Sequence, residues 1–312
     1  MAKNRYVVWI AVLVIMNAAS PLVSSQEKQK ESAFDISVSA VSIAVTVQDN
    51  KGRFINDLTE NDFTVFENQQ KKQISYFRHD FQAPISLAVL LDVSGSMELQ
   101  HKMEECKAAL GYLLTYLLRP QDEVSLLIFA DGAVEVASRF STDKQDFLTV
   151  LAGTEAYGQT ALNDAVAVSP EFANQGKNEK RALLLITDGV ENDSYSTPEQ
   201  AVEIARRVDV PIYTIGYKIP LSEQLEKHKR APELSSTGIV ETLGRFSRAT
   251  GGKAYFFDRV FDLNAAMREI KRELSHQYII GYTSYTDPED TYRKIEVRTS
   301  HKKYHVRTRE GY

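Results

Sequence analysis

An apolar run over residues 85–91, broken only by Ser86, ends abruptly in Asp92, and the hydroxyl residues Ser94 and Ser96 follow at alternate positions. A run without polar alternation is typical of a strand that is buried on both faces of a parallel sheet. Asp92, Ser94 and Ser96 place three side-chain oxygens close together in the chain, and ligand sets made only of oxygen suit hard cations such as Mg2+. The stretch therefore predicts a divalent-metal loop at the carboxyl edge of a sheet.

Apolar strand patterns and helical patterns alternate over residues 84–276, which favours a doubly wound, mostly parallel α/β sheet. Asp131 and Gly132 are a two-residue hairpin signal, so we expect one antiparallel strand at an edge of this sheet. Cys106, the only cysteine, lies in the helical pattern over 99–118 and is expected to be a small buried core residue. The other strands are expected at 124–129, 134–136, 183–186, 210–217 and 254–257, and the other helices at 144–151, 161–172, 198–208, 239–249 and 263–275.

The segments on both sides of this α/β region show β patterns instead. Near-alternation of apolar and polar residues predicts strands at 36–47, 63–66 and 74–77, with a turn over 68–71, and again at 277–282, 294–298 and 304–309. Neither flank is long enough to bury a core of its own. We therefore expect an N-terminal β module at 34–82 and a C-terminal β segment at 277–312 that pack together like a β-sandwich.

Residues 1–25 have the pattern of an export signal. Lys3 and Arg5 precede an apolar run over 6–16, and small residues lead to a cleavage site expected before Gln26. The run is shorter than the roughly 20 apolar residues that a membrane span needs. We expect a signal peptide at 1–25, a flexible linker at 26–33, and a secreted or periplasmic protein without a stable membrane span after cleavage. An uncleaved N-terminal membrane anchor is the alternative.

Thr160 and Asp188 belong to other segments that reach the same edge of the predicted sheet. Asp188 follows the apolar strand at 183–186, and Thr160 lies in a loop just before a helix. In open parallel sheets, ligands bind beyond the carboxyl ends of the strands, so these residues should meet the first loop there. Ser94 and Ser96 alone could be helix N-caps. Together with Thr160 and Asp188 they favour a metal site of two carboxylates and three hydroxyls.

The set formed by the stretch 92–96, Thr160 and Asp188 resembles the metal-ion-dependent adhesion site (MIDAS) of the von Willebrand factor type A (VWFA) domain, a Rossmann-like fold that would occupy residues 84–276. The resemblance implies that the three hydroxyls supply coordinating oxygens and that the two aspartates bind the ion directly or through water. It implies Mg2+ as the ion, with Mn2+ or Ca2+ as alternatives. It also implies that a carboxylate of a partner protein completes the coordination.

The flanks narrow this resemblance. Residues 58–67 before the domain and 277–282 after it make the layout similar to exported bacterial VWFA-related proteins, a family first defined in Acidobacteria. Little is known of what that family does, so the resemblance indicates the fold and the metal site but not the biological role.

The residue types at the site also indicate the chemistry of a partner. Because the hydroxyls are neutral, a divalent ion there stays electron-poor, and an Asp or Glu of a protein partner would offset its own desolvation by binding to it. Residues at the rim are more suited to contact that partner than to bind the metal. The rim candidates are Glu98 and Asn192, and a basic cluster in the insertion 218–236 that could steer an acidic partner, namely Lys227, Lys229 and Arg230. Asp164, one helical turn after Thr160, is expected to make a structural hydrogen bond.

Several other functions are disfavoured. With 37 Lys and Arg against 42 Asp and Glu, the chain lacks the basic footprint of a nucleic-acid-binding protein. The six histidines show no zinc-binding spacing. Ser94 stands where a phosphotransferase of the haloacid dehalogenase type needs its second aspartate, and the Gly-x-Ser-x-Gly elbow of serine hydrolases is absent around it.

These observations predict a non-enzymatic, exported, metal-dependent protein-binding module for adhesion or scaffolding. The first alternative is an envelope assembly or maturation factor for a metalloenzyme complex, and the second is a Mg2+-dependent hydrolase.

Overall fold

The computed structural model describes residues 37–219, 236–286 and 292–312. The expected signal peptide and linker lie outside these ranges, as do Lys227, Lys229 and Arg230. Within the described ranges, every helix is too short or too polar to cross a bilayer.

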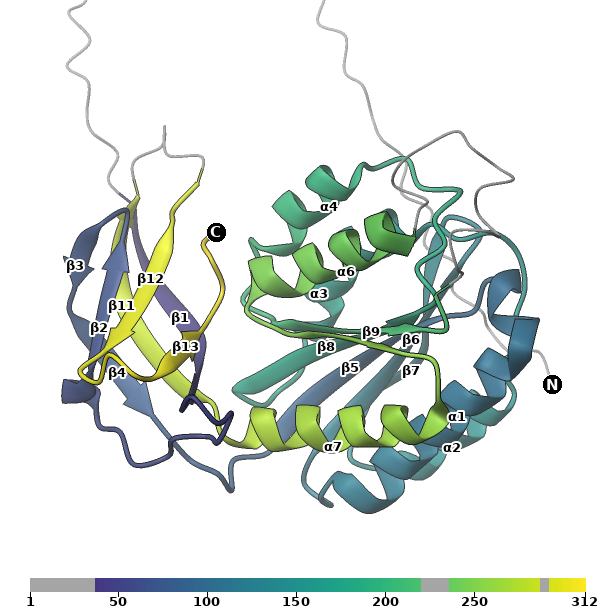
Figure 1. The fold of residues 1–312 in the computed structure, drawn as a ribbon, viewed down its shortest axis with the longest axis horizontal. Coiled ribbons are helices and arrows are strands. Elements are labelled where there is room, and N and C mark those ends of the chain that lie inside the picture. Colours follow the sequence, from purple (N-terminus) through teal and green to yellow (C-terminus); the bar gives the residue numbers. More distant parts are fainter. Residues whose placement is uncertain (1–36, 220–235, 287–291) are drawn as a thin grey trace, which may run out of the picture.

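A six-stranded sheet forms the centre of the larger unit, with the strand order β10-β9-β8-β5-β6-β7 (Figure 1). All neighbouring pairs are parallel except β6 and β7, so the predicted antiparallel edge strand and the doubly wound fold class are confirmed. Asp131 and Gly132 make the β6–β7 turn, both with positive φ as a tight hairpin requires. The strands are β5 (Ile85–Asp92), β6 (Glu123–Ala130), β7 (Ala133–Ser141), β8 (Lys180–Thr187), β9 (Ile212–Tyr217) and β10 (Ala254–Phe257).

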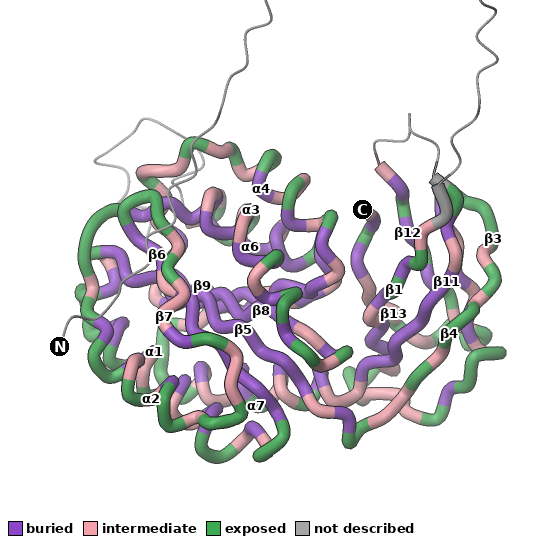
Figure 2. The backbone as a smooth tube through the Cα atoms, turned by 180° about the vertical axis from the view of Figure 1, so that it is seen from behind, coloured by how far each residue is buried: buried purple, intermediate pink, exposed green. Residues whose placement is uncertain are grey.

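Helices cover both faces of this sheet, which explains why the run in β5 is apolar at nearly every position. Leu87, Val89 and Leu91 pack on one face, and Ala88 and Leu90 pack on the other. Figure 2 shows β5, β8 and β9 as the buried centre of the unit. The first face is covered by α1 (Lys102–Tyr112), a π-helical turn (Leu113–Leu117), α2 (Lys144–Ala152) and α7 (Val260–Ser275). The second is covered by α3 (Leu162–Ala173), α4 (Pro198–Ala205) and α6 (Ser236–Thr250).

The helix predicted over 99–118 is not continuous. A short 3-10 segment, Gly95–His101, follows β5, and α1 begins only at Lys102. Gln100 and His101 both have left-handed backbone conformations, with φ of 57° and 58°, and such residues interrupt a right-handed helix. Cys106 lies in α1 and is fully buried, as predicted.

The smaller unit is made of strands from both ends of the chain. A four-stranded sheet has the order β13-β1-β11-β4, and a three-stranded sheet has the order β12-β2-β3. The long strand β1 (Ser37–Gln48) pairs antiparallel with β11 (Tyr278–Thr286), with Ile43 opposite Ile280. The other strands are β2 (Phe63–Glu67), β3 (Gln70–Lys72), β4 (Ile74–Arg78), β12 (Ile295–Thr299) and β13 (His305–Arg307). Their inward side chains form one core, which includes Val45, Val65, Tyr278 and Val297.

The turn expected over 68–71 is shorter than predicted. Asn68 and Gln69 alone turn the chain, with φ of 48° and 66°, and β3 begins at Gln70. Because two residues with positive φ suffice for a tight hairpin, the polar residues Gln70 and Lys71 are free to pair with β2.

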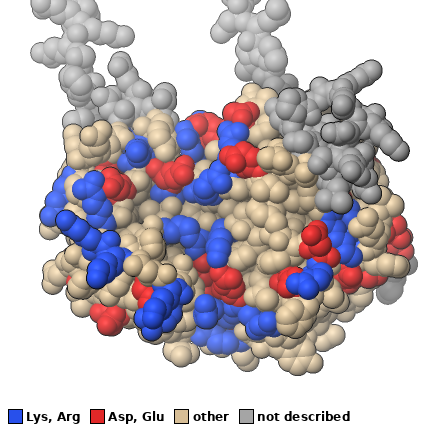
Figure 3. Space-filling model, viewed as in Figure 1, with Lys and Arg blue, Asp and Glu red and all other residues tan. Residues whose placement is uncertain are grey.

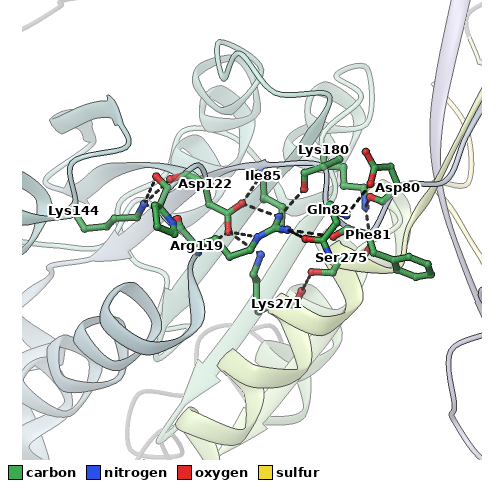
Figure 4. Close-up of polar contacts among 12 residues, drawn as sticks. Asp80, Phe81, Gln82, Ile85, Arg119, Asp122, Lys144, Lys180, Lys271 and Ser275 are labelled. Atoms are coloured by element: carbon green, nitrogen blue, oxygen red, sulfur yellow. Dashed lines mark hydrogen bonds and ion pairs between the residues drawn. The ribbon is translucent and has the colours of Figure 1, made fainter.

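A buried charge cluster fixes the two places where the chain crosses between the units (Figure 4). Asp122 accepts hydrogen bonds from the backbone N–H of Ile85 at 3.0 Å and from Lys271 Nζ at 2.8 Å. Arg119 pairs with Asp122 and donates to the carbonyl of Ala83, in the crossing from β4 to β5. Lys180 Nζ donates to the carbonyls of Asp80 at 2.8 Å and Ser275 at 2.7 Å, so it joins both crossings.

Candidate metal centre

The candidate site lies at the carboxyl ends of the two central strands. Leu91 pairs with Ile186 in the parallel ladder between β5 and β8. Asp92 is the last residue of β5, and Asp188 is the first residue after β8. Both side chains are fully buried. The ladder therefore brings the two predicted carboxylates to the same edge.

Asp92 is held by hydrogen bonds on both carboxylate oxygens. Oδ1 accepts from the N–H of Ser94 at 2.9 Å, and Oδ2 accepts from the hydroxyl of Thr187 at 2.6 Å. Burial and the nearby Asp188 carboxylate raise the pKa of Asp92 to about 7, although the hydrogen bonds from Thr187 and Ser94 act in the opposite direction. A cation between the two aspartates would relieve this repulsion.

The two serines of the loop present their hydroxyls together. Ser94 Oγ and Ser96 Oγ are 3.2 Å apart, so both oxygens can bind one ion. Ser94 is buried and Ser96 is partly exposed, which places the pair at the boundary with solvent. The N–H of Gly95 between them donates to the carbonyl of Gly158 at 3.0 Å. The serine loop is thus tied to the loop that carries Thr160.

Thr160 is buried and is anchored to the loop after β8. Its N–H donates to Asn192 Oδ1 at 2.8 Å, and its carbonyl accepts from the N–H groups of Asn192 at 3.1 Å and Asp193 at 3.0 Å. Backbone and side-chain bonds therefore join all three loops that carry the predicted site residues. Asn192, predicted at the rim, is exposed and also fixes the Thr160 loop.

A lysine lies inside the site. Lys102, 3% exposed, forms an ion pair with Asp188 in which Nζ and Oδ2 are 2.6 Å apart. The same Nζ donates to the carbonyl of Ser96 at 3.3 Å. The other oxygen of Asp188 accepts from the N–H of Val190 at 3.1 Å. Asp188 is therefore linked through Lys102 to the serine loop.

The donor set fits a hard divalent ion. Mg2+ takes one or two carboxylates and keeps several waters, and Asp92 and Asp188 with three hydroxyls match that preference. Within the described residues, no three or more His, Cys, Asp or Glu side chains gather as they would around zinc. An ion here would depend on Ser94, Ser96 and Thr160 for oxygen ligands.

The rim of the site is both polar and apolar. Glu98 and Leu99 are exposed in the segment Gly95–His101, and Tyr195 is exposed in the loop after β8. Asp164 accepts from the N–H groups of Tyr195 at 2.8 Å and Ser196 at 2.9 Å, which confirms the structural hydrogen bonding predicted for it. On the face seen in Figure 3, positive and negative side chains are interspersed.

Sequence reasoning missed Lys102 and Thr187. A signal for Lys102 was present, because it lies four residues before Cys106 and so on the buried face of the same helix. Thr187 precedes Asp188 at the end of an apolar strand. A polar residue in that place is a candidate hydrogen-bond donor to the carboxylate at the end of the neighbouring strand, here Asp92.

Part of the chain matches a known domain family. Residues 87–191 match the family model of the von Willebrand factor type A domain. An uncharacterized protein of Borreliella burgdorferi is 22% identical over 228 residues, which cover 69% of this chain and 65% of that relative. The match thus spans slightly less than two thirds of the relative's length.

The chain also resembles solved structures at low sequence identity. The conserved hypothetical protein BatB from Bacteroides thetaiotaomicron is 18% identical with a TM-score of 0.47, over 61% of this chain and 97% of that chain. The pilus adhesin SpaC from Lactobacillus rhamnosus GG, in an open conformation, is 10% identical with a TM-score of 0.50, over 85% of this chain and 42% of that chain.

Proposed function

We propose that this chain, whose residues 87–191 match the von Willebrand factor type A domain, is a metal-dependent protein-binding module. Asp92, Ser94, Ser96, Thr160 and Asp188 would hold Mg2+, with Mn2+ or Ca2+ as alternatives. An Asp or Glu side chain of a partner protein would complete the coordination. The observation that carries this proposal is the meeting of two buried carboxylates with the paired hydroxyls of Ser94 and Ser96, 3.2 Å apart, at one sheet edge.

The hydrogen bonds of Asp92 favour a role in positioning a metal ion. Both of its oxygens accept hydrogen bonds from Ser94 and Thr187, which orient the group. A general base or nucleophile needs an oxygen directed at a substrate. Asp92 therefore suits the positioning of an ion better than hydrolysis.

Export is part of the proposal. Its support is the signal pattern at 1–25, which lies outside the described residues. SpaC, described as a pilus adhesin, shares the fold, and an adhesive role outside the cell suits the same domain. The narrower resemblance to exported bacterial VWFA-related proteins stays a prediction.

A pull-down tests the proposed function. The mature chain is used to capture partners from an envelope extract in Mg2+, in EDTA, and as the Asp92→Ala variant in Mg2+. Partners should be retained by the unmodified chain in Mg2+ and lost both in EDTA and with Asp92→Ala. Asp57→Ala, at an exposed position in the smaller unit, is the matched control and should retain them. Equal retention under all conditions would refute metal-mediated capture.

A further inference from the structure

Lys102 is an unusual neighbour for a metal site. Its side chain is 4% exposed and its ammonium is 2.6 Å from Asp188 Oδ2. Burial of an ammonium is costly unless it is paired and hydrogen-bonded. Here Nζ has the carboxylate of Asp188 and the carbonyl of Ser96 as partners. The centre therefore contains a positive charge of its own.

The backbone before Lys102 is strained in a way that places this residue. Gln100 and His101 have φ of 57° and 58°, a conformation that is unfavourable for residues other than glycine. Lys218 Nζ donates to the carbonyl of Gln100 at 2.9 Å and also pairs with Glu105. These contacts hold the two left-handed residues, after which α1 starts directly with Lys102. The site is built to keep the lysine against Asp188.

We propose that Lys102 is a resident cation that sets the charge of the metal centre, so that a divalent ion binds weakly alone and more tightly together with an anionic oxygen from a partner. The inference rests on the proposed metal-binding function and adds a regulating residue to it. Asp92 and Asp188, when ionised, carry two negative charges, and Lys102 cancels one of them. A divalent ion then makes the centre positive overall, and an incoming carboxylate restores neutrality.

Coulomb repulsion gives the direction of the effect. Lys102 and a metal ion would share Asp188 inside a buried site, where charges interact far more strongly than in water. Replacing Lys102 with an uncharged residue removes that repulsion and leaves the ionised centre neutral when the metal is bound. The metal alone should then bind more tightly, and the added benefit of an anion should shrink. By linkage, the anion and the metal must affect each other's binding equally.

Calorimetric titration with Mn2+ alone tests the inference. Lys102→Met should bind Mn2+ roughly tenfold or more tightly than the unmodified chain. Lys102→Arg keeps the charge and should stay near the original affinity. Lys253→Met is the matched control, because it removes one lysine charge at the opposite edge of the sheet, before β10. Lys102→Gln, whose amide can still donate to Asp188, provides the same comparison if the methionine variant fails to fold.

A second titration in the presence of acetate measures the coupling. Acetate should tighten Mn2+ binding to the unmodified chain by a larger factor than to Lys102→Met or Lys102→Gln. Equal Mn2+ affinity in the charged and uncharged variants would overturn the role of Lys102 while leaving the metal site intact. If none of the folded proteins binds Mn2+, the proposed function itself fails, and the inference fails with it.

Discussion

Thr187 and Asp92 are joined across the two central strands by a hydrogen bond of 2.6 Å from Thr187 Oγ1 to Asp92 Oδ2. Both side chains are fully buried. Thr187 Oγ1 also accepts from the N–H of Gly189 at 2.9 Å, in the turn that carries Asp188. One hydroxyl thus orients one carboxylate of the candidate site and shapes the loop that holds the other.

Thr187→Val should weaken metal binding without removing a proposed ligand. The substitution keeps the shape of the side chain but leaves Asp92 Oδ2 without this donor, and loss of such supporting hydrogen bonds typically costs 10- to 100-fold in metal affinity. Thr187→Ser retains the hydroxyl and is the control. Titration calorimetry with Mn2+ should rank the affinities as unmodified, then Thr187→Ser, then Thr187→Val. An unchanged affinity in Thr187→Val would contradict the orienting role.

Gly158→Ala should displace the Thr160 loop. Gly158 has φ of +70°, and a Cβ there would lie 2.2 Å from Asp131 Oδ1, which accepts from the N–H of Gln159 at 2.7 Å. We expect unfolding free energy to fall by about 1–3 kcal/mol from backbone strain. Affinity for Mn2+ should also fall roughly tenfold, because Thr160 moves. Gly153→Ala, where the nearest atom would be 3.7 Å away, is the control and should leave both values nearly unchanged.

The meeting of Asp92 and Asp188 at one edge of the sheet could be predicted because each carboxylate stands at the end of an apolar run. Asp92 and Asp188 follow buried runs, and parallel strands bring their ends to one edge. The position of Lys102 could not be predicted in the same way. It depends on two residues, Gln100 and His101, whose left-handed backbone is held by a contact from Lys218, which directly follows β9. Side-chain contacts between remote segments have no local pattern.

We expected the N-terminal and C-terminal β segments to pack together because neither is long enough to form a core of its own. In the structure, β1 and β11 pair along their length. The charge cluster that fixes both crossings was not expected. The helical pattern predicted over 99–118 ends just before Arg119, and nothing in the sequence singles out Asp122. Asp122 is buried in contacts with the N–H of Ile85 and with Lys271, which lie on remote segments of the chain, and a single sequence does not display such contacts.

Asp122→Asn should destabilise the protein strongly. Asp122 is fully buried and carries the ion pairs with Arg119 and Lys271, whose Nζ is 2.8 Å away. Removing the charge leaves two partly buried cations without their partner, which typically costs about 3–5 kcal/mol. Urea denaturation at pH 7 measures the loss, and Asp57→Asn, at an exposed position, should differ from the unmodified chain by less than about 0.5 kcal/mol. Similar midpoints for both variants would show that the cluster is dispensable.

The loss of stability in Asp122→Asn should also depend on pH, because the Asp122 carboxyl of the unmodified chain is ionisable. Burial raises its pKa, but the hydrogen bonds from Arg119 and Lys271 outweigh burial and hold the pKa below the usual value. A carboxyl with a lowered folded pKa contributes stability above its unfolded pKa of 3.8 and loses it as pH falls through the folded value. The difference between the unmodified chain and Asp122→Asn should therefore shrink in acid.

His79, in the smaller unit, should make the stability of the protein sensitive to acid. Its ring stacks on Tyr278 with centroids 3.9 Å apart, and its Nε2 is buried without a hydrogen-bond partner among the described residues. Burial, followed by the charges of Lys180 and His276, lowers the pKa of His79 to about 4, although Asp80 acts in the opposite direction. The folded protein thus keeps this imidazole neutral at pH values where the unfolded chain protonates it.

His79→Phe should make the protein less sensitive to acid while keeping the stack on Tyr278. Between the unfolded pKa of 6.5 and the folded pKa of about 4, the unfolded state binds more protons, so unfolding free energy falls as pH decreases through this window. The unmodified chain should lose about 3 kcal/mol more than the variant between pH 7.5 and pH 4, because each tenfold change in proton affinity is worth about 1.4 kcal/mol. Urea denaturation across this range measures the difference. His301→Phe, at an exposed position in the same unit, should follow the unmodified chain, and a His79→Phe profile that did the same would assign the acid sensitivity to other groups.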